Sequence, residues 1–387
     1  MTASQGHRFP DQLPDQGLGE DQSFQAIKAL VTARSAKLGA PDVLAHMDPA
    51  PADIAAKLVG LNAQFNQNLL HPDLSPFATE AEQRVISWLA PYFGMSTGHI
   101  CAGSTLANLT ALWCARKQGA RRVVASKDAH ISVPKSADIL GMSYDAIPVD
   151  PHGRLDRSQL PDLSDAALVL TAGTTGRGVV DDLALEPLRR KKSPLWTHVD
   201  AAWAGPLRLT CHGNRLAGIE QADSVCVSAH KWLFQPKDSA LVFFHNPDAQ
   251  NLLAFGSAYL ASPNIGIQGS RSAAGVALLG TLLAWGRSGL EAEIIRCLSV
   301  ADHLADRLAA DPRAELKQRP ETGVLNWRPC SSAPCDQDAF TDRVIKALGP
   351  TASRTAINGE PWLRHVSANL FADEAVIWQK IDQVLEG

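Results

Sequence analysis

The chain has 387 residues, and its 36 lysines and arginines nearly balance its 40 aspartates and glutamates, giving a formal net charge of -4. Hydrophobic residues make up 45% of the chain, which is enough for a large core and excludes a protein that is disordered throughout. The near-neutral charge gives no electrostatic basis for binding nucleic acid or an anionic membrane. We therefore expect a folded protein that acts on small molecules.

The cysteines and the N-terminus predict a cytoplasmic protein. The seven cysteines are an odd number without a Cys-x-x-Cys pair, which favours reduced thiols over a disulfide framework. Residues 1–20 predict a flexible arm, since they lack the basic start and apolar run of a secretory signal. No apolar run approaches the roughly 18–20 residues that span a bilayer. Cys330 and Cys335 have no matching second pair, so no metal site is predicted.

Residues 21–75 predict an N-terminal helical segment. Apolar residues recur at helical spacing between 24 and 61, and a polar connecting loop follows. Thr79 begins a further helical pattern, and Glu82, three residues on, is the expected partner in a capping box.

Residues 76–272 predict a large α/β domain, because short apolar runs alternate there with helical segments. The expected strands are 121–125, 144–149, 167–171, 195–199, 224–227 and 240–244. The expected helices are 105–117, 133–140 and 183–190. The strands are nearly continuous in Val, Leu and Ala, which is typical of a mainly parallel sheet covered on both faces. Ligands bind such sheets at the carboxyl ends of the strands.

Residues 273–387 predict connecting helices followed by a small C-terminal α+β domain. Long helical patterns extend through Gly286 and again over 290–309. Strand patterns then occur at 323–327 and 363–370, each followed by a helical pattern.

The strongest chemical signal is Lys231, in the run Ser228-Ala229-His230-Lys231-Trp232 directly after a predicted strand. Partial burial lowers the pKa of a lysine, and the neutral amine can form a Schiff base with an aldehyde. The alternative is a lysine that extends from the strand end into solvent. This segment alone does not separate the two interpretations.

Three further elements point to the same chemistry. Asp200 ends another predicted strand, and a carboxylate there can hold the pyridine nitrogen of pyridoxal phosphate protonated, although a helix N-cap is the alternative. Ser104 and Thr105 open a helix whose N-terminus can bind an anion, or they are ordinary caps. His130 offers a flat ring that can stack on a cofactor, or it is structural.

Taken in order, these motifs resemble the group II pyridoxal-phosphate-dependent amino-acid decarboxylases. The residues that carry the resemblance are Ser75-Pro76, Thr79, Glu82, Gly103-Ser104-Thr105, Asn108, His130, Gly173-Thr174-Thr175, Asp181, His198 to Ala202, Ser228 to Trp232 and Gly269-Ser270-Arg271. The resemblance implies a PLP-dependent transferase-like (fold-type I) architecture, the cofactor pyridoxal 5'-phosphate and a homodimer with shared active sites. It also implies an enzyme that decarboxylates an L-amino acid to carbon dioxide and an amine.

The resemblance assigns roles residue by residue. Lys231 becomes the Schiff-base lysine, Asp200 the partner of the pyridine nitrogen, and His130 the stacking ring, which also assists proton transfer. The remaining cofactor contacts that it implies are Gly103, Ser104 and Thr105 at the phosphate, Ser228 and His230 close to it, Thr175, Ala202 and Asp181 around the ring, and Ser270 from the second subunit. For the substrate it implies Arg364 at the carboxylate, with His71, Phe77 and Trp203 as candidates for the side-chain pocket.

The sequence departs from the family in one place. Many members carry a long loop whose tyrosine returns a proton to the substrate carbon. The corresponding interval here, 251–268, is short, and its one tyrosine is Tyr259. Tyr259 is the candidate for that step, with a packing role as the alternative. Two other functions remain open: a retro-aldol carbon–carbon lyase of the same fold, and a catalytically idle interaction subunit.

Overall fold

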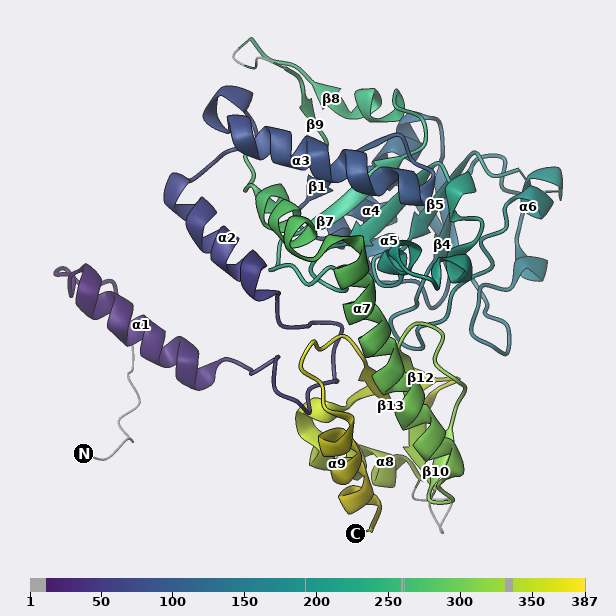
Figure 1. Cartoon of the computed structure of the whole chain (residues 1–387). Coiled ribbons are helices and arrows are strands. Elements are labelled where there is room, and N and C mark those ends of the chain that lie inside the picture. The colour runs from purple at the N-terminus through teal and green to yellow at the C-terminus, as the bar shows by residue number, and fades with distance from the viewer. Residues whose placement is uncertain (1–11, 192, 259, 261, 331–336, 387) are drawn as a thin grey trace. The chain divides into compact units, whose positions relative to one another are not determined.

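The computed structural model describes residues 12–191, 193–258, 260, 262–330 and 337–386 (Figure 1). The chain divides into one unit that ends at Lys37 and a second that runs from Leu38 to the C-terminus. The first unit contains helix α1 (Glu20–Arg34), which has no buried residue. Within the described residues, no helix is both long enough and apolar enough to cross a membrane.

A seven-stranded sheet forms the centre of the second unit. In the order β1-β7-β6-β5-β4-β2-β3, its strands are β1 (Thr97–Cys101), β7 (Ala240–Phe244), β6 (Ser224–Ser228), β5 (Trp196–Asp200), β4 (Ala166–Thr171), β2 (Arg122–Ser126) and β3 (Ser143–Ile147). Neighbours from β6 to β3 are parallel, and β7 is antiparallel to both β1 and β6. The predicted, mainly parallel sheet is confirmed, and its six predicted strands lie within two residues of the observed ones.

Helices cover both faces of this sheet, which explains the continuous apolar runs. Successive side chains of a strand point to opposite faces, so Val124 packs with α3 (Pro76–Leu89) and α7 (Ala274–Ala310). Its neighbour Val123 packs on the other side with α4 (Ser104–Lys117) and α5 (Ser132–Leu140). Both faces of the sheet are therefore shielded from water, so the strands need no alternation of apolar and polar residues.

The helices flanking the sheet differ from the prediction in detail. Helix α2 spans Asp53–Phe65, α6 spans Glu186–Lys191, and α3 begins at Pro76, three residues before Thr79. The predicted capping box is wrong, because no side chain caps α3 and Glu82 instead forms a buried ion pair with Arg271, at 2.5 Å between oxygen and nitrogen. Glu82 thus pairs with a residue that is distant in the sequence and not with the start of its own helix.

The C-terminal part is a small α+β domain, as predicted. Helix α7 leads into it through a break at Gly286, whose φ of 62° interrupts the helical geometry. The four strands of its antiparallel sheet, in order, are β10 (Ala314–Leu316), β11 (Val324–Pro329), β13 (Glu360–Val366) and β12 (Ser353–Ile357). Helices α8 (Gln337–Leu348) and α9 (Glu374–Glu386) pack on this sheet through an apolar core of its own. A short pair, β8 (Ala254–Phe255) and β9 (Asn264–Ile265), precedes α7.

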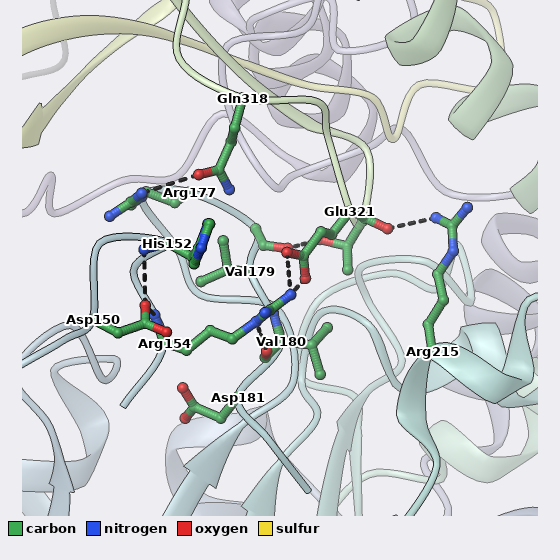
Figure 2. A network of polar contacts seen from close by, with 12 residues as sticks. Asp150, His152, Arg154, Arg177, Val179, Val180, Asp181, Arg215, Gln318 and Glu321 are labelled. Atoms are coloured by element: carbon green, nitrogen blue, oxygen red, sulfur yellow. Dashed lines mark hydrogen bonds and ion pairs between the residues drawn. The ribbon is translucent and has the colours of Figure 1, made fainter. Parts of the chain in front are cut away.

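A charged network joins the two domains (Figure 2). Arg154 forms an ion pair with Glu321 at 2.7 Å, and the backbone carbonyl of Glu321 accepts a hydrogen bond from Arg215 at 2.5 Å. Arg177 donates to Gln318 at 3.0 Å. We call these five residues the Arg154 network. They hold the loop before β11 against the loops that follow β3, β4 and β5.

Candidate active site

The carboxyl ends of the parallel strands bring the main sequence candidates to one edge of the sheet. Asp200, the last residue of β5, lies beside Thr171 at the end of β4 and beside Cys226 near the end of β6. Lys231 follows β6 by three residues, and His130 follows β2 by four. Because these strands run in the same direction, their ends meet where an α/β sheet binds its ligands.

Asp200 lies close enough to Lys231 and His130 for its charge to affect the pKa of both. Burial lowers the pKa of the Lys231 ammonium, and the negative charge of Asp200 opposes that shift. Burial also lowers the pKa of the His130 ring, while the charge of Asp200 raises it and that of Lys231 lowers it further. A lysine with a lowered pKa supplies the neutral amine that Schiff-base chemistry requires.

Asp200 is held by hydrogen bonds in a nearly dry position. It is only 3% exposed, and its two oxygens accept from Asn108 Nδ2 at 2.9 Å and from the Ala202 backbone amide at 3.1 Å. Cys226 lies beside it, with Sγ 3.9 Å from Oδ1, and burial raises the pKa of that thiol well above its ordinary value. The neutral thiol therefore does not compete with Asp200 for positive charge.

Ser132 holds the ring of His130. The Ser132 hydroxyl lies 2.8 Å from His130 Nδ1, and the Ser132 backbone amide donates to the same nitrogen at 3.2 Å. A nitrogen that accepts from an amide carries no proton, so the proton of the neutral ring is on Nε2. His130 thus presents an Nε2–H donor on the side of the ring away from Ser132.

The N-terminus of α4 offers an anion site. Gly103 precedes it with φ of 96°, a conformation that strains any residue with a Cβ atom, and no side chain caps the helix. The first helical residues, Ser104 and Thr105, carry hydroxyls at the positive end of the helix dipole. The free amides, the dipole and the hydroxyls together fit a phosphate group.

His230 borders the same site in its neutral form. Its Nδ1 lies 3.2 Å from the Ser239 carbonyl oxygen, which accepts only, so the proton is on Nδ1 and Nε2 accepts from the Ser228 hydroxyl, also at 3.2 Å. Burial lowers the pKa of His230 to about 4. A Cβ atom added to Gly103 would lie 4.0 Å from this ring, so the loop before α4 and the Lys231 segment are in contact.

These features fit pyridoxal phosphate. The anion site at α4 matches the phosphate, the buried carboxylate of Asp200 matches a protonated pyridine nitrogen, and Lys231 matches the aldehyde. Three groups of different chemistry, contributed by three separate segments, therefore converge at one edge of the sheet.

Arg364 links the small domain to this edge. From β13, its Nη1 donates to the Thr175 carbonyl oxygen at 2.8 Å, its Nη2 donates to the Ala45 carbonyl oxygen at 3.2 Å, and its Nε donates to Ser353 Oγ at 3.1 Å. Thr175 is thus held through its backbone. A guanidinium has five N–H donors, so Arg364 keeps two beyond these three bonds.

Two candidates are committed to other contacts. Both carboxylate oxygens of Asp181 accept backbone amides, from Leu155 and Thr171, each at 2.7 Å, and burial raises its pKa to about 6. Trp203 is 1% exposed, its ring centroid lies 4.3 Å from that of Trp232, and its Nε1 donates to the Thr322 carbonyl oxygen. Trp203 therefore packs in the core, and its part in the substrate pocket stays a prediction.

The remaining candidates come from the N-terminal segment, the start of α3 and the loop before α7. Ser270 accepts a hydrogen bond from Asn68 Nδ2 at 3.1 Å, and the neighbouring Arg271 ion pair with Glu82 fixes this loop. His71 lies just before a short 3-10 turn, and Phe77 on α3 is exposed. Tyr259 lies outside the described residues.

Two polar residues at the site belong to the quoted motifs but had received no role. Asn108 lies in α4 and His198 lies in β5. The Asn108 side chain forms hydrogen bonds to His198 and to Asp200. The sequence could have pointed to them, because each is a polar residue within an otherwise apolar pattern, and a buried amide or imidazole requires a hydrogen-bond partner.

Comparison with known proteins identifies the family. The model of the pyridoxal-dependent decarboxylase conserved domain matches residues 4–328, so the chain belongs to the pyridoxal-dependent decarboxylases, which are lyases. An L-2,4-diaminobutyrate decarboxylase of Rhizobium meliloti (strain 1021) is 31% identical over 87% of this chain and 75% of its own length. An aspartate 1-decarboxylase of Aliivibrio fischeri is 28% identical over 77% of this chain and 65% of its own length.

Solved structures share the fold. The crystal structure of Oryza sativa TDC with PLP and tryptamine matches with a TM-score of 0.87 and 20% identity, over 97% of this chain and 90% of that one. The glutamate decarboxylase domain from Vibrio parahaemolyticus matches with a TM-score of 0.84 and 22% identity, over 97% and 87%. The predicted family, fold-type I architecture, amino-acid decarboxylase class and cofactor are thereby confirmed.

Proposed function

We propose that the chain decarboxylates an L-α-amino acid with Lys231 as the Schiff-base lysine, Asp200 as the partner of the pyridine nitrogen and His130 as the ring that stacks on the cofactor. The observation that carries the proposal is that these three groups lie at or just after the ends of parallel strands at the carboxyl edge of the sheet, where the charge of Asp200 raises the pKa of both Lys231 and His130 against the effect of burial. The anion site at Gly103, Ser104 and Thr105, with Ser228 and His230 beside it, supports it further.

Each residue then has one task. Pyridoxal phosphate, when bound, supplies an electron sink for the electrons that remain when carbon dioxide leaves. Asp200 keeps a proton on the ring nitrogen, and His130 presents Nε2–H for proton transfer. The two remaining donors of Arg364 bind the substrate carboxylate and orient the bond to be broken, while Thr175 and Ala202 border the ring and Asp181 holds the backbone around it.

The substrates of the related enzymes suggest the first compounds to test. The names of the similar proteins specify L-2,4-diaminobutyrate and aspartate, both amino acids with short polar side chains. We therefore propose that this chain also accepts a short polar L-amino acid. His71 and Phe77 are retained as candidates for the pocket, and Tyr259 for the final proton transfer.

The trapping experiment tests the cofactor chemistry. Borohydride should fix the cofactor covalently to the wild-type protein, and Lys231→Ala should abolish the adduct while a peptide map locates it at position 231. Carbon dioxide release is then measured across L-2,4-diaminobutyrate, L-aspartate, L-glutamate and L-tyrosine. An adduct that persists in Lys231→Ala contradicts the role of Lys231. Cleavage of a phosphorylated amino alcohol without carbon dioxide release from any amino acid supports the retro-aldol alternative instead.

We also propose that the working enzyme is a homodimer in which Ser270 reaches the phosphate of the second subunit. Exposed apolar side chains gather on and near α2 and α3, as is typical of an interface: Val59, Leu61, Phe65, Leu74 and Phe77. Sedimentation should give two copies per particle. Co-expressing Lys231→Ala with Ser270→Asp, each inactive alone, should restore one complete site per mixed dimer. If each site is complete within one chain, mixing restores nothing.

A cytoplasmic location is part of the proposal. Cys101, Cys114, Cys211, Cys226, Cys297 and Cys330 are all free in the described chain, which supports a reducing compartment. Fractionating cells of the source organism and detecting the chain with an antibody tests this. Recovery in a membrane or extracellular fraction would contradict it.

A further inference from the structure

We propose that Asn108 is a positioning residue that couples the proton on His130 to the ionised carboxylate of Asp200. The inference rests on the proposed roles of those two residues. Asn108 is 1% exposed, in the second turn of α4. Its Nδ2 lies 2.9 Å from Asp200 Oδ2 and 2.9 Å from Ser132 Oγ, and its Oδ1 lies 2.9 Å from His198 Nε2.

The carboxylate of Asp200 decides the orientation of the amide. An ionised carboxylate only accepts hydrogen bonds, so it must face the NH₂ group of Asn108 and not the carbonyl oxygen. With Nδ2 fixed there, Oδ1 faces His198 and accepts from its Nε2–H. The amide therefore points one way only, although nitrogen and oxygen have nearly the same shape.

The hydrogen bonds that run from Asn108 through His198 leave neither ring nitrogen of His198 without a partner. Since the proton of His198 is on Nε2, its Nδ1 accepts from the Ser224 hydroxyl at 2.9 Å. The same hydroxyl oxygen accepts from Trp196 Nε1, also at 2.9 Å. Burial lowers the pKa of His198 to about 4, so the ring is neutral near pH 7 and needs no further partner.

The arm through Ser132 reaches His130. Ser132 Oγ accepts one hydrogen of Asn108 Nδ2, which leaves its own hydroxyl proton for His130 Nδ1 at 2.8 Å. His130 Nδ1 then receives two donors, this hydroxyl and the Ser132 amide. Two donors oppose protonation of Nδ1 and keep the proton of the neutral ring on Nε2, where the proposed reaction needs it.

Asn108, Ser132, His198, Ser224 and Asp200 thus form a connected set that we call the Asn108 network. The two hydrogens of Asn108 are divided between Asp200 and the serine that holds His130. Aspartate has the same shape but no donor, and leucine has neither donor nor acceptor. We therefore expect only an amide at position 108 to satisfy both arms.

The first test uses the wild-type apoprotein and does not depend on cofactor chemistry. Long-range ¹H–¹⁵N spectra of histidine-labelled protein report the protonated nitrogen of each ring, and His130→Gln and His198→Gln variants assign the signals. We expect the proton on Nε2 in both rings near pH 7. A proton on Nδ1 of either His130 or His198 would overturn the proposal.

The second test is Asn108→Asp. Two carboxylates at hydrogen-bonding distance do not both stay ionised, so one takes up a proton, and Ser132 turns its hydroxyl toward position 108. We expect the pKa of His130 to rise as Nδ1 loses a donor, with the charges of Asp200, Lys231 and Lys135 still around it. The apoprotein should also bind pyridoxal phosphate about tenfold more weakly, because Asp200 then shares one proton with the carboxyl at position 108 and offers less negative charge to the ring nitrogen.

Asn369→Asp is the matched control. Asn369 is 2% exposed and makes the same pattern of bonds in the small domain, two from Nδ2 to the carbonyl oxygens of Ala40 and Val43 and one to Oδ1 from the Phe371 amide. It should lower the melting temperature as Asn108→Asp does, without changing the His130 pKa or cofactor affinity. Equal effects of the two variants on all three quantities would reduce Asn108 to a structural residue. A wild-type protein that does not bind pyridoxal phosphate contradicts the proposed function instead.

Discussion

The Asn108 network and the Arg154 network both join segments that are distant in sequence, but they differ in charge and in access to water. The Asn108 network has one ionised group, Asp200, and its members are buried. In the Arg154 network, Arg154 pairs with Glu321 (Figure 2), and their side chains are 39% and 28% exposed. Both residues line a cavity of about 620 Å³. Geometry at the site is thus fixed by buried hydrogen bonds around one ionised carboxylate, and at the domain junction by one partly solvated ion pair together with hydrogen bonds from Arg177 and Arg215.

This contrast has an energetic consequence. An ion pair that water reaches contributes about 0–1 kcal/mol, because its charges are well solvated when separated. A buried polar group that loses its partner costs about 1–3 kcal/mol, since water does not replace the missing bond. Equivalent substitutions should therefore have large effects in the Asn108 network and small ones in the Arg154 network.

The largest effect is expected from removing the single charge of the Asn108 network. Asp200→Asn keeps the shape but cannot hold a proton on the ring nitrogen, and we expect kcat/KM to fall roughly 100- to 1,000-fold. The matched removal of charge in the other network, Glu321→Gln, should leave kcat/KM within about twofold. Steady-state kinetics on both variants measures the difference. Similar losses in the two would remove the distinction between the networks.

Acid should destabilise the protein through its buried histidines. Burial lowers the pKa of His99, His198 and His365 to about 4, below the unfolded value of 6.5, so the unfolded chain binds more protons between those limits. Stability is therefore complete above pH 6.5 and is lost as pH falls toward 4, by roughly 1–2 kcal/mol per histidine at pH 5. Asp181, whose pKa burial raises to about 6, offsets part of this, since the folded chain holds its proton more tightly.

Urea unfolding at pH 7, 6 and 5 measures this slope. His198→Gln, within the Asn108 network, should make the slope shallower because it removes one of these buried histidines, whereas Glu321→Gln removes none of them and should leave the slope unchanged. A free energy of unfolding that stays constant from pH 7 to pH 5 would show that these histidines are not buried in their neutral form.

A smaller effect is expected from Ser132→Ala. The variant removes the hydroxyl between Asn108 and His130 but leaves the backbone amide that donates to His130 Nδ1. We expect a loss of about tenfold in kcat with little change in cofactor affinity, because Asp200 keeps its bond to Asn108. Comparing kcat with the dissociation constant of pyridoxal phosphate separates the contact through Ser132 to His130 from the contact of Asn108 with Asp200. A parallel loss in both would contradict that separation.

The smallest effect is expected in the Arg154 network itself. Arg154→Met should lower the free energy of unfolding by less than about 1 kcal/mol, and less still at high salt, since the pair with Glu321 is partly solvated. Denaturant curves at two ionic strengths measure both quantities. A decrease of several kcal/mol in the free energy of unfolding would mean that the Arg154–Glu321 pair is as well shielded from water as the Asn108 network.

Local sequence was sufficient for strands whose residues are apolar on both faces, and insufficient elsewhere. Strand β1 was missed because it contains Gly98 and His99. The glycine is required there, since a Cβ atom would collide with the Val242 carbonyl oxygen of the adjacent strand. The antiparallel direction of β7 depends on the path of the chain, which no local pattern records.

The candidate site shows the same limit. Lys231, Asp200 and His130 were predicted because each follows a recognisable strand and has distinctive chemistry. Asn108 remained without a role because its partners Asp200 and His198 lie 92 and 90 residues away. Glu82 was assigned to a local cap for the same reason, since its true partner, Arg271, is 189 residues distant.

The contact between Trp203 and Trp232 has a spectroscopic consequence. The two indoles lie with centroids 4.3 Å apart, both are fully buried, and Trp232 adjoins Lys231 in the chain. The Schiff base of pyridoxal phosphate with a lysine absorbs violet light, which overlaps the long-wavelength side of indole emission, so loading the site should quench part of this emission by energy transfer. The enzyme therefore carries its own fluorescent reporter of cofactor occupancy, one residue from the lysine that binds it.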